Sequence, residues 1–322
     1  MMDFLYQLIE PAQSWLFQSL VLPTLHALGF MAHADAAYDA TGVAVLGIAE
    51  VLLIYTLLRP VEAMLPAERW TDRRGARVDV LYTLLYRSGA LPLLFFLALS
   101  PLLNPVDIGL RELGYLPPNL EELIPGLGAA PFLAFLTYLV IIDFSIYWFH
   151  RAQHRFDWWW ALHAVHHSQR QMSLWTDDRN HVLDGLLEAL WLAVLALLIG
   201  VPGAQFAAII FFTKLVESLS HANVRFGFGR IGDRLLVSPR YHRVHHGIGV
   251  GHEGAARGCN FATLFPVWDI LFGTANFERD YPATGIRDQL EGADYGRGFV
   301  AQQRLALTRL WRALARGRPT SA

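Results

Sequence analysis

Eight histidines fall into three short clusters, at residues 150–154, 163–167 and 242–246. Their spacings are His-x-x-x-His, then His-x-x-His-His twice. Positions three and four apart share one face of a helix, so each cluster aims its imidazoles in one direction. Neutral imidazole is the commonest protein ligand of metals and suits iron, zinc and copper. Because eight rings exceed what one ion needs, the pattern predicts a two-metal centre held by His150, His154, His163, His166, His167, His242, His245 and His246.

Further residues near these clusters are candidates for the same centre. His221 lies between the second and third clusters and is predicted to be a ninth ligand, whereas His181 is a possible ligand or a supporting residue. A metal-bound imidazole also needs a hydrogen-bond partner on its second nitrogen. The candidates for that role are Asp143, Asp178, Asn223, Asn260 and Asp269.

The rest of the composition narrows the chemistry. The single cysteine, Cys259, excludes an intramolecular disulfide and a cysteine-based zinc site. A site rich in imidazole, free of thiolate and with open positions fits redox-active iron. No basic stripe is present, so a nucleic-acid partner is not expected.

Composition also predicts that the chain is embedded in a membrane. Hydrophobic residues make up 54% of the 322 residues and charged residues only 17%, below the roughly 25% of soluble domains. Three apolar runs are candidate membrane helices, at residues 41–58, 81–103 and 131–147, although Arg87 interrupts the second. A fourth apolar stretch, at 183–212, is split by glycine and proline at 200–203, which predicts a helical hairpin. The segment 104–128, rich in proline and glycine, is predicted to be a loop.

These elements divide the chain into four predicted parts. An amphipathic or partly inserted leader (1–41) precedes membrane helices and loops (42–134), a catalytic domain (135–280) and a basic tail (281–322). Arginine alternates with apolar residues in the tail, which favours an amphipathic helix on the membrane surface over a plain solvated helix. The predicted fold class is therefore an all-α integral membrane protein, with about four transmembrane helices plus a helical hairpin and a helical cap that holds the dimetal site.

The distribution of arginine predicts the orientation. The segment 59–77 is rich in arginine and should be cytoplasmic, whereas the acidic segment 104–128, one span later, should be external. The next span then returns to the cytoplasmic side and delivers His150 there. All the clustered histidines would share that side, so we expect a bacterial inner-membrane protein with a cytoplasmic metal site.

The order of the three clusters after membrane spans resembles the fatty acid hydroxylase/sterol desaturase superfamily. The resemblance covers roughly residues 135–275 and includes Ser238-Pro-Arg-Tyr-His242 and the closing Trp268-Asp269-Ile-Leu-Phe-Gly273. It implies a non-haem centre of two iron ions that uses O2 to attack an unactivated C–H bond of a lipid. Ala262 stands where the family commonly has glycine, which weakens assignment to one subfamily but removes no ligand.

This resemblance leaves some alternatives open. Hydroxylation and desaturation use the same ligand pattern, and electrons are expected from a separate reductase, ferredoxin or cytochrome b5-like protein. A membrane zinc hydrolase would need a carboxylate near the clusters, for which Asp178 and Glu253 are the candidates. A non-catalytic haem- or lipid-binding membrane protein is the remaining alternative.

Overall fold

The computed structural model describes residues 2–71, 73–116, 118–249 and 258–316. These residues are helical or irregular, without a β-strand, so the predicted all-α class is confirmed. The α-helices are α1 (Met2–Leu16), α2 (Leu22–Leu28), α3 (Ala34–Met64), α4 (Arg73–Arg87), α5 (Ala90–Glu112), α6 (Leu120–Leu123), α7 (Pro131–Arg155), α8 (Asp157–His167), α9 (Val182–Ile199), α10 (Gly203–His221), α11 (Gly229–Leu235), α12 (Pro239–His245), α13 (Val267–Leu271) and α14 (Phe299–Arg316).

Four stretches of helix are long and apolar enough to cross a membrane. They are Met31–Met64, which contains α3, and the helices Ala90–Glu112, Pro131–Arg155 and Val182–Ile199. Most of their apolar surface is not covered by protein: in α5 and α9 only 11% of the most apolar stretch is buried. Apolar side chains that face outward over such lengths are typical of helices whose solvent is lipid.

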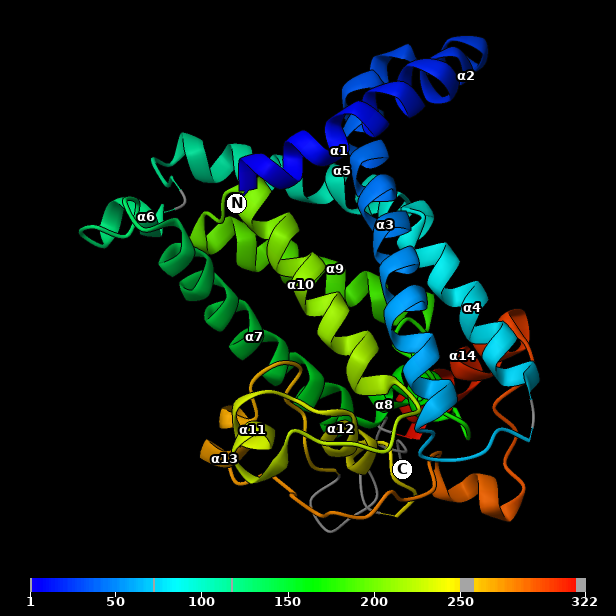
Figure 1. Ribbon diagram of the computed structural model, residues 1–322. Coiled ribbons are helices and arrows are strands. Elements are labelled where there is room, and N and C mark those ends of the chain that lie inside the picture. The colour runs from blue at the N-terminus through cyan, green and yellow to red at the C-terminus, as the bar shows by residue number, and fades with distance from the viewer. Residues whose placement is uncertain (1, 72, 117, 250–257, 317–322) are drawn as a thin grey trace, which may run out of the picture.

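The long helices converge on a group of short ones. Figure 1 shows α8, α11, α12, α13 and α14 gathered at one end of α3, α7 and α10. A core that includes Tyr138 and Ile142 of α7 and Ile209 of α10 joins two of the long helices. The helix α14 packs along α8 and buries Gln302 and Ala306. The predicted tail helix is thus confirmed as a helix, and one of its sides is occupied by the protein.

The basic segment 59–77 lies at this same end of the molecule. Glu62 accepts hydrogen bonds from the backbone N–H groups of Leu174 (2.8 Å) and Asn223 (2.8 Å). Glu68 forms an ion pair with Arg243 of α12 at 2.9 Å. These contacts place the arginine-rich segment 59–77 beside the third histidine cluster.

The predicted span at 81–103 is confirmed as a candidate membrane helix, but its start is wrong, because the chain ends one helix and begins another inside the predicted run. Helix α4 ends at Arg87, Gly89 adopts the left-handed conformation (φ 82°), and α5 begins at Ala90. Arg87 is buried against Glu50 of α3 and against Asp177 and Asp178 of the loop before α9. The boundary between α4 and α5 is therefore marked by a charged residue that is surrounded by protein and does not face lipid.

The predicted loop at 104–128 is also wrong in its first part. Helix α5 continues through Pro101 and Pro105 to Glu112. Proline is tolerated inside membrane-type helices when the freed carbonyls find other partners. The hairpin at 183–212, by contrast, is confirmed: α9 ends at left-handed Gly200 and α10 begins at Gly203.

Close packing of α3 on the end of α4 gives a first prediction. A Cβ built on Gly47 of α3 would lie 1.8 Å from the carbonyl oxygen of Arg87. The variant Gly47→Ala must therefore force the two helices apart, and we expect a loss of about 1–3 kcal/mol of stability. The matched control is Gly109→Ala, because a Cβ on Gly109 meets nothing within 4 Å.

Thermal unfolding of the two purified variants in detergent checks this expectation. The midpoint should fall for Gly47→Ala and stay level or rise slightly for Gly109→Ala, since alanine favours a helix over glycine by up to about 1 kcal/mol. Equal midpoints for both variants would mean that the contact between α3 and Arg87 is not rigid.

Candidate metal centre

Four helices bring the clustered histidines together. His150 and His154 lie on the last turns of α7, and the 163–167 cluster ends α8. His242 and His245 lie on α12, and His246 follows as its C-cap; Ser238 caps the start of this helix by accepting a hydrogen bond from the Tyr241 backbone N–H, with Pro239 in the first turn. His221 is the last residue of α10. The predicted helical placement of all three clusters is thus observed.

One group of four imidazoles consists of His150, His154, His167 and His245. One ring nitrogen from each lies within 4.8 Å of the others, and all four side chains are buried. The ring centroids of His150 and His245 are 4.6 Å apart, and those of His154 and His167 are 4.7 Å apart. These four rings come from α7, α8 and α12.

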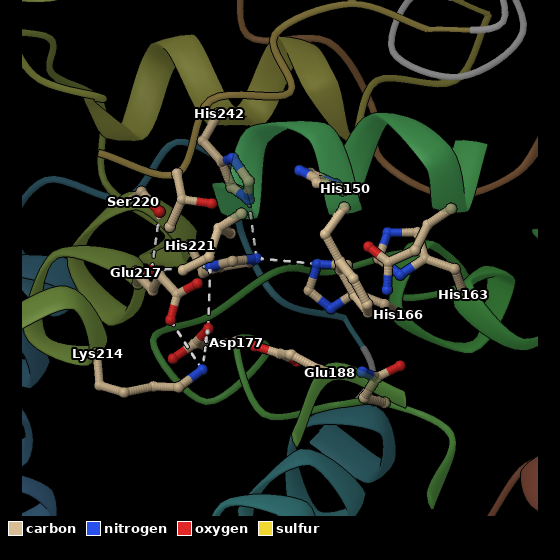
Figure 2. A pocket seen from close by; sticks show the side chains of 15 residues that line it. His150, His163, His166, Asp177, Glu188, Lys214, Glu217, Ser220, His221 and His242 are labelled. Atoms are coloured by element: carbon tan, nitrogen blue, oxygen red, sulfur yellow. Dashed lines mark hydrogen bonds and ion pairs between the residues drawn. The ribbon is translucent and has the colours of Figure 1, made fainter. Parts of the chain in front are cut away.

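A second group of four consists of His166, His221, His242 and His246, again buried and within 4.8 Å. The Nε2 atom of His221 lies 3.2 Å from Nε2 of His166 and 2.9 Å from Nε2 of His242. His246 Nε2 lies 3.1 Å from His242 Nε2. Figure 2 shows the rings of His166, His221 and His242 pointing toward one another.

The two groups are neighbours. The rings of His167 and His246, one from each group, stack with their centroids 4.3 Å apart. His163 belongs to neither group of four but lies against both, with centroid distances of 5.2 Å to His150 and 5.2 Å to His166. Its Nε2 is buried and has no hydrogen-bond partner in the described part of the chain. All nine predicted histidine ligands therefore meet in one place, as two adjacent groups with His163 beside both.

Backbone carbonyls fix the rings in both groups. In the first group, Nδ1 of His150 lies 2.8 Å from the Phe261 carbonyl oxygen, and Nδ1 of His245 lies 2.7 Å from the Cys259 carbonyl oxygen. In the second group, Nδ1 of His166 lies 3.1 Å from the Arg179 carbonyl and that of His221 lies 2.7 Å from the Glu217 carbonyl. A carbonyl can only accept, so each Nδ1 carries the proton and each Nε2 presents a lone pair to the centre.

Burial keeps the rings neutral. Loss of hydration and, next, the neighbouring His246 lower the pKa of His167 well below its usual range. Burial and the neighbouring His166 do the same to the pKa of His246. Only a neutral imidazole can bind a metal, so at neutral pH these rings are in the ligating form.

The spacing of the nitrogens fits a metal ion with several imidazole ligands. Two nitrogens bound to one ion at about 2.1 Å, at right angles to each other, are about 3.0 Å apart. The contacts of 2.9–3.2 Å in the second group have that separation. Without an ion between them, such contacts would leave ring nitrogens with lone pairs facing one another, at a cost in free energy.

The candidate partners named from sequence have other roles. The Asp143 carboxylate accepts hydrogen bonds from the Leu264 backbone N–H (2.9 Å) and the Trp268 indole (2.8 Å). The Asn223 side chain accepts a hydrogen bond from the Glu68 backbone N–H and donates one to the Glu68 carbonyl. These side chains fix loops around the site, and neither contacts a histidine ring.

Asn260 and Asp269 act one step away from the metal centre. Asn260, with φ of 57°, binds the backbone of Tyr241 and Asn276. Asp269 accepts hydrogen bonds from the backbone N–H of Phe261 (2.8 Å) and from the Tyr241 hydroxyl (2.9 Å). Because the Phe261 carbonyl contacts His150, Asp269 positions that ring through the backbone.

His181 and Asp178 are likewise placed away from the two groups of four. His181 caps α9 by accepting a hydrogen bond from the Leu183 backbone N–H (3.0 Å), and its Nε2 contacts the Gln303 carbonyl. Asp178 pairs with Arg87 at 2.9 Å. Glu253, the other carboxylate considered for zinc hydrolysis, lies outside the described residues.

A carboxylate that lies within hydrogen-bond distance of a ligand ring was not predicted. Asp184, in the first turn of α9, is fully buried and lies 3.2 Å from Nδ1 of His163. It also accepts hydrogen bonds from Gln153 (2.9 Å) and from the Trp159 indole (2.7 Å). The only sequence signal was an aspartate at the start of a long apolar run.

Asp184 gives a second prediction. The variant Asp184→Asn keeps the shape of the side chain but replaces one acceptor oxygen with an NH2 group, so the three donors can no longer all be satisfied. We expect metal affinity to fall about 10–100-fold, as for other buried partners of metal-bound histidines. Competition against a chelator of known affinity measures the effect. Asp107→Asn, at a partly exposed pair with Arg111, should leave the metal affinity unchanged.

Comparison with known proteins agrees with this geometry. Residues 135–274 match the family model described as Fatty acid hydroxylase. The chain is 32% identical over 148 residues to the human alkylglycerol monooxygenase, which is 45% of this chain and 31% of that protein. It is 31% identical over 164 residues to the ornithine lipid hydroxylase OlsE of Rhizobium tropici, covering 51% of this chain and 47% of that protein.

A sterol desaturase is also related. The chain is 32% identical over 113 residues to the Delta(7)-sterol-C5(6)-desaturase of Nicotiana tabacum, covering 34% of this chain and 40% of that enzyme. The matched segments span between about a third and half of the length of these relatives. No solved structure matches significantly. The predicted resemblance to this superfamily is confirmed for residues 135–274, and this matched segment contains all nine histidines of the candidate centre.

Proposed function

Because residues 135–274 carry a fatty acid hydroxylase domain, we propose that the chain is a membrane-bound non-haem di-iron enzyme that uses O2 to hydroxylate a C–H bond of a lipid. The observation that carries the proposal is the convergence of two buried groups of four imidazoles. Imidazole-rich sites without thiolate suit redox iron, and two adjacent groups suit two ions. When bound, the iron pair would supply the O2 activation and the oxidising power for the C–H bond.

We assign each ion to one group. His150, His154, His167 and His245 would hold the first iron, and His166, His221, His242 and His246 the second. His163, which lies against both groups, is assigned as a further ligand whose orientation Asp184 fixes. The protein's part is to hold these rings, to keep them neutral by burial and to exclude water from the reacting carbon.

The relatives guide the choice of reaction. Their names include a monooxygenase, a lipid hydroxylase and a sterol desaturase, all acting on lipids. We favour hydroxylation because two of these relatives, with longer aligned segments than the desaturase, are named as a monooxygenase and a hydroxylase. A zinc hydrolase is not favoured, because both groups of four contain only histidine and Asp178 is engaged by Arg87.

The proposed setting is a bacterial inner membrane with the metal site on the cytoplasmic side. Support comes from the arginine-rich segment 59–77, which lies at the same end as the histidines through the contacts of Glu62 and Glu68. Positive residues mark cytoplasmic ends of membrane helices. A separate protein would deliver electrons there.

Isotope labelling with purified protein tests the function. The protein is purified in detergent, its metal content is measured, and it is supplied with reductant, membrane lipid extract and ¹⁸O2. We expect two iron ions per chain and a lipid product carrying one ¹⁸O atom. Bound zinc, with a product formed equally well without O2, would replace this proposal with hydrolysis.

A further inference from the structure

An apolar cavity lies between two of the candidate membrane helices. Its volume is about 430 Å³, within the roughly 300–1,000 Å³ of small-molecule sites. From α5 it is lined by Phe95, Phe96 and Leu99, among others, and from α9 by Ala189 and Ala193, among others. The lining is mostly apolar, so the cavity fits hydrocarbon and not a polar ligand.

This cavity adjoins the metal centre. A smaller cavity of about 80 Å³ is lined by His150, His163, His166, His221 and His242. Both cavities are lined by Glu188 of α9 and Lys214 of α10. Figure 2 shows these two side chains at the edge of the histidine group. An apolar passage therefore ends beside the metal centre, at one acidic and one basic residue.

Small residues on α9 keep the passage open. Gly185, Ala189 and Ala193 follow one another at four-residue intervals and so share a face of the helix. On the opposite wall, the lining of α5 extends from Pro92 to Asn104. Twelve residues of helix span about 18 Å, so the passage is long and narrow. Such a shape fits a straight hydrocarbon chain.

The outer wall of the passage borders the surface. Phe96, which lines the cavity, is 53% exposed. Both α5 and α9 are among the helices long and apolar enough to cross a membrane. A lipid chain could therefore enter sideways from the bilayer without passing through water.

The inner end of the passage carries charged side chains. Lys214 pairs with Glu217 at 2.8 Å and lies 3.9 Å from Asp177. Glu188 forms no hydrogen bond or ion pair among the described residues, and its main electrostatic attraction is to Lys214. Glu188 is a half-buried carboxylate that lacks a hydrogen-bond donor among the described residues, so it suits a ligand group that donates a hydrogen bond and repels one that carries a negative charge.

We infer that this passage binds the straight hydrocarbon chain of the substrate, and that Glu188 accepts a hydrogen bond from an uncharged, hydroxyl-bearing polar end. The inference rests on the proposed function and deepens it. Because the polar end lies at the junction with the metal centre, the carbon attacked is close to that end and not in the middle of the chain or at its tip.

Photolabelling tests the chain-binding site independently of turnover. The probe is a straight-chain fatty alcohol with a diazirine near the end of its chain, added to the whole protein in detergent. We expect crosslinked peptides from α5 and α9. The variant Ala193→Phe, which fills the passage, should reduce this labelling about tenfold, a change of about 1.4 kcal/mol.

The matched control is Val194→Phe. Val194 is the next residue on α9, is 41% exposed and does not line the cavity. Labelling should match the unaltered protein. Equal labelling in Ala193→Phe and in the unaltered protein, or labels spread over all lipid-facing helices, would overturn the inference.

Competition tests the role of Glu188. A fatty alcohol and a free fatty acid of equal chain length compete with the probe, and we expect the alcohol to compete about tenfold better. Glu188→Gln should narrow this difference, because the amide removes the negative charge but keeps the shape. A fatty acid that competes as well as the alcohol would refute the assigned polar end.

The two proposals can fail separately. If the probe labels the passage specifically and Ala193→Phe removes that labelling, but the protein inserts no oxygen, the binding site is supported and the proposed function is wrong. If ¹⁸O enters lipid but Ala193→Phe alters neither labelling nor the chain lengths of the products, the function stands and the passage is wrong.

Discussion

Replacing His166 or His245 by alanine is expected to abolish lipid oxidation and to remove one of the two metal ions. The two residues belong to different groups of four, so each variant damages a different half of the centre. The loss of a direct ligand should exceed the roughly 10–100-fold effect of losing an outer partner. Iron should fall from two ions per chain to about one in either variant, and to none when both changes are combined.

Metal analysis of purified protein and oxygen insertion into lipid measure these effects together. His26→Ala serves as the control, because His26 lies on α2, is exposed, and belongs to neither group. It should keep full iron and full activity. If His166→Ala and His245→Ala each kept two iron ions and unchanged turnover, the assignment of both groups would be wrong.

The histidine helices could be predicted because their signals are local. Spacings of three and four residues define a helix face whatever the rest of the chain does. Ser238 and Pro239 mark the start of α12 in the same local way, and the structure has that cap. That the three clusters meet was expected from the predicted membrane topology, in which all of them lie on the same side of the membrane.

The partners of the rings could not be predicted in this way. Every residue has a backbone carbonyl, so nothing in the sequence distinguishes those of Phe261 and Arg179, which contact His150 and His166. Asp184 lies 21 residues from His163 and is brought to it by the packing of α8 against α9. The polar residues named from the sequence hold the surrounding loops instead. Asp143, for example, accepts hydrogen bonds from the Leu264 backbone N–H and the Trp268 indole.

The membrane helices show a similar limit. Hydropathy found the apolar runs, but it could not tell that Arg87, inside one of them, ends a helix. That depends on carboxylates that are far away in sequence, such as Glu50 and Asp177. Nor could it tell that Pro101 and Pro105 lie within a continuous helix.

Arg87→Met is expected to be the most destabilising single change outside the metal centre. The Arg87 guanidinium contacts Glu50 at 2.8 Å, Asp177 at 2.7 Å and Asp178 at 2.9 Å, and its side chain is only 4% exposed. Methionine preserves much of the volume but leaves three carboxylates buried without their cation. Removing one partner of a buried ion pair costs about 3–5 kcal/mol.

Thermal unfolding should show this as a fall in Tm on the order of 10 °C. The control is Arg111→Met, because Arg111 pairs with Asp107 four residues away at the surface, and its side chain is 52% exposed. Exposed pairs of this kind contribute only about 0–1 kcal/mol. Equal midpoints for the two variants would mean that the Arg87 carboxylates reach water and need no cation.

The same cluster touches the metal centre, so the effect should extend beyond stability. Asp177, held by Arg87, lies 3.9 Å from Nδ1 of His221, whose Nε2 belongs to the second group of four. The variant Arg87→Lys keeps the positive charge, but the single ammonium group of lysine cannot contact three carboxylates as the forked guanidinium of arginine does. We therefore expect Arg87→Lys to fold but to lose iron to a chelator faster than the unaltered protein, and to lose it first from the group that contains His221. Iron retention equal to that of the unaltered protein would show that Asp177 does not position His221, and that the buried charges serve only to join α3, α4 and α10.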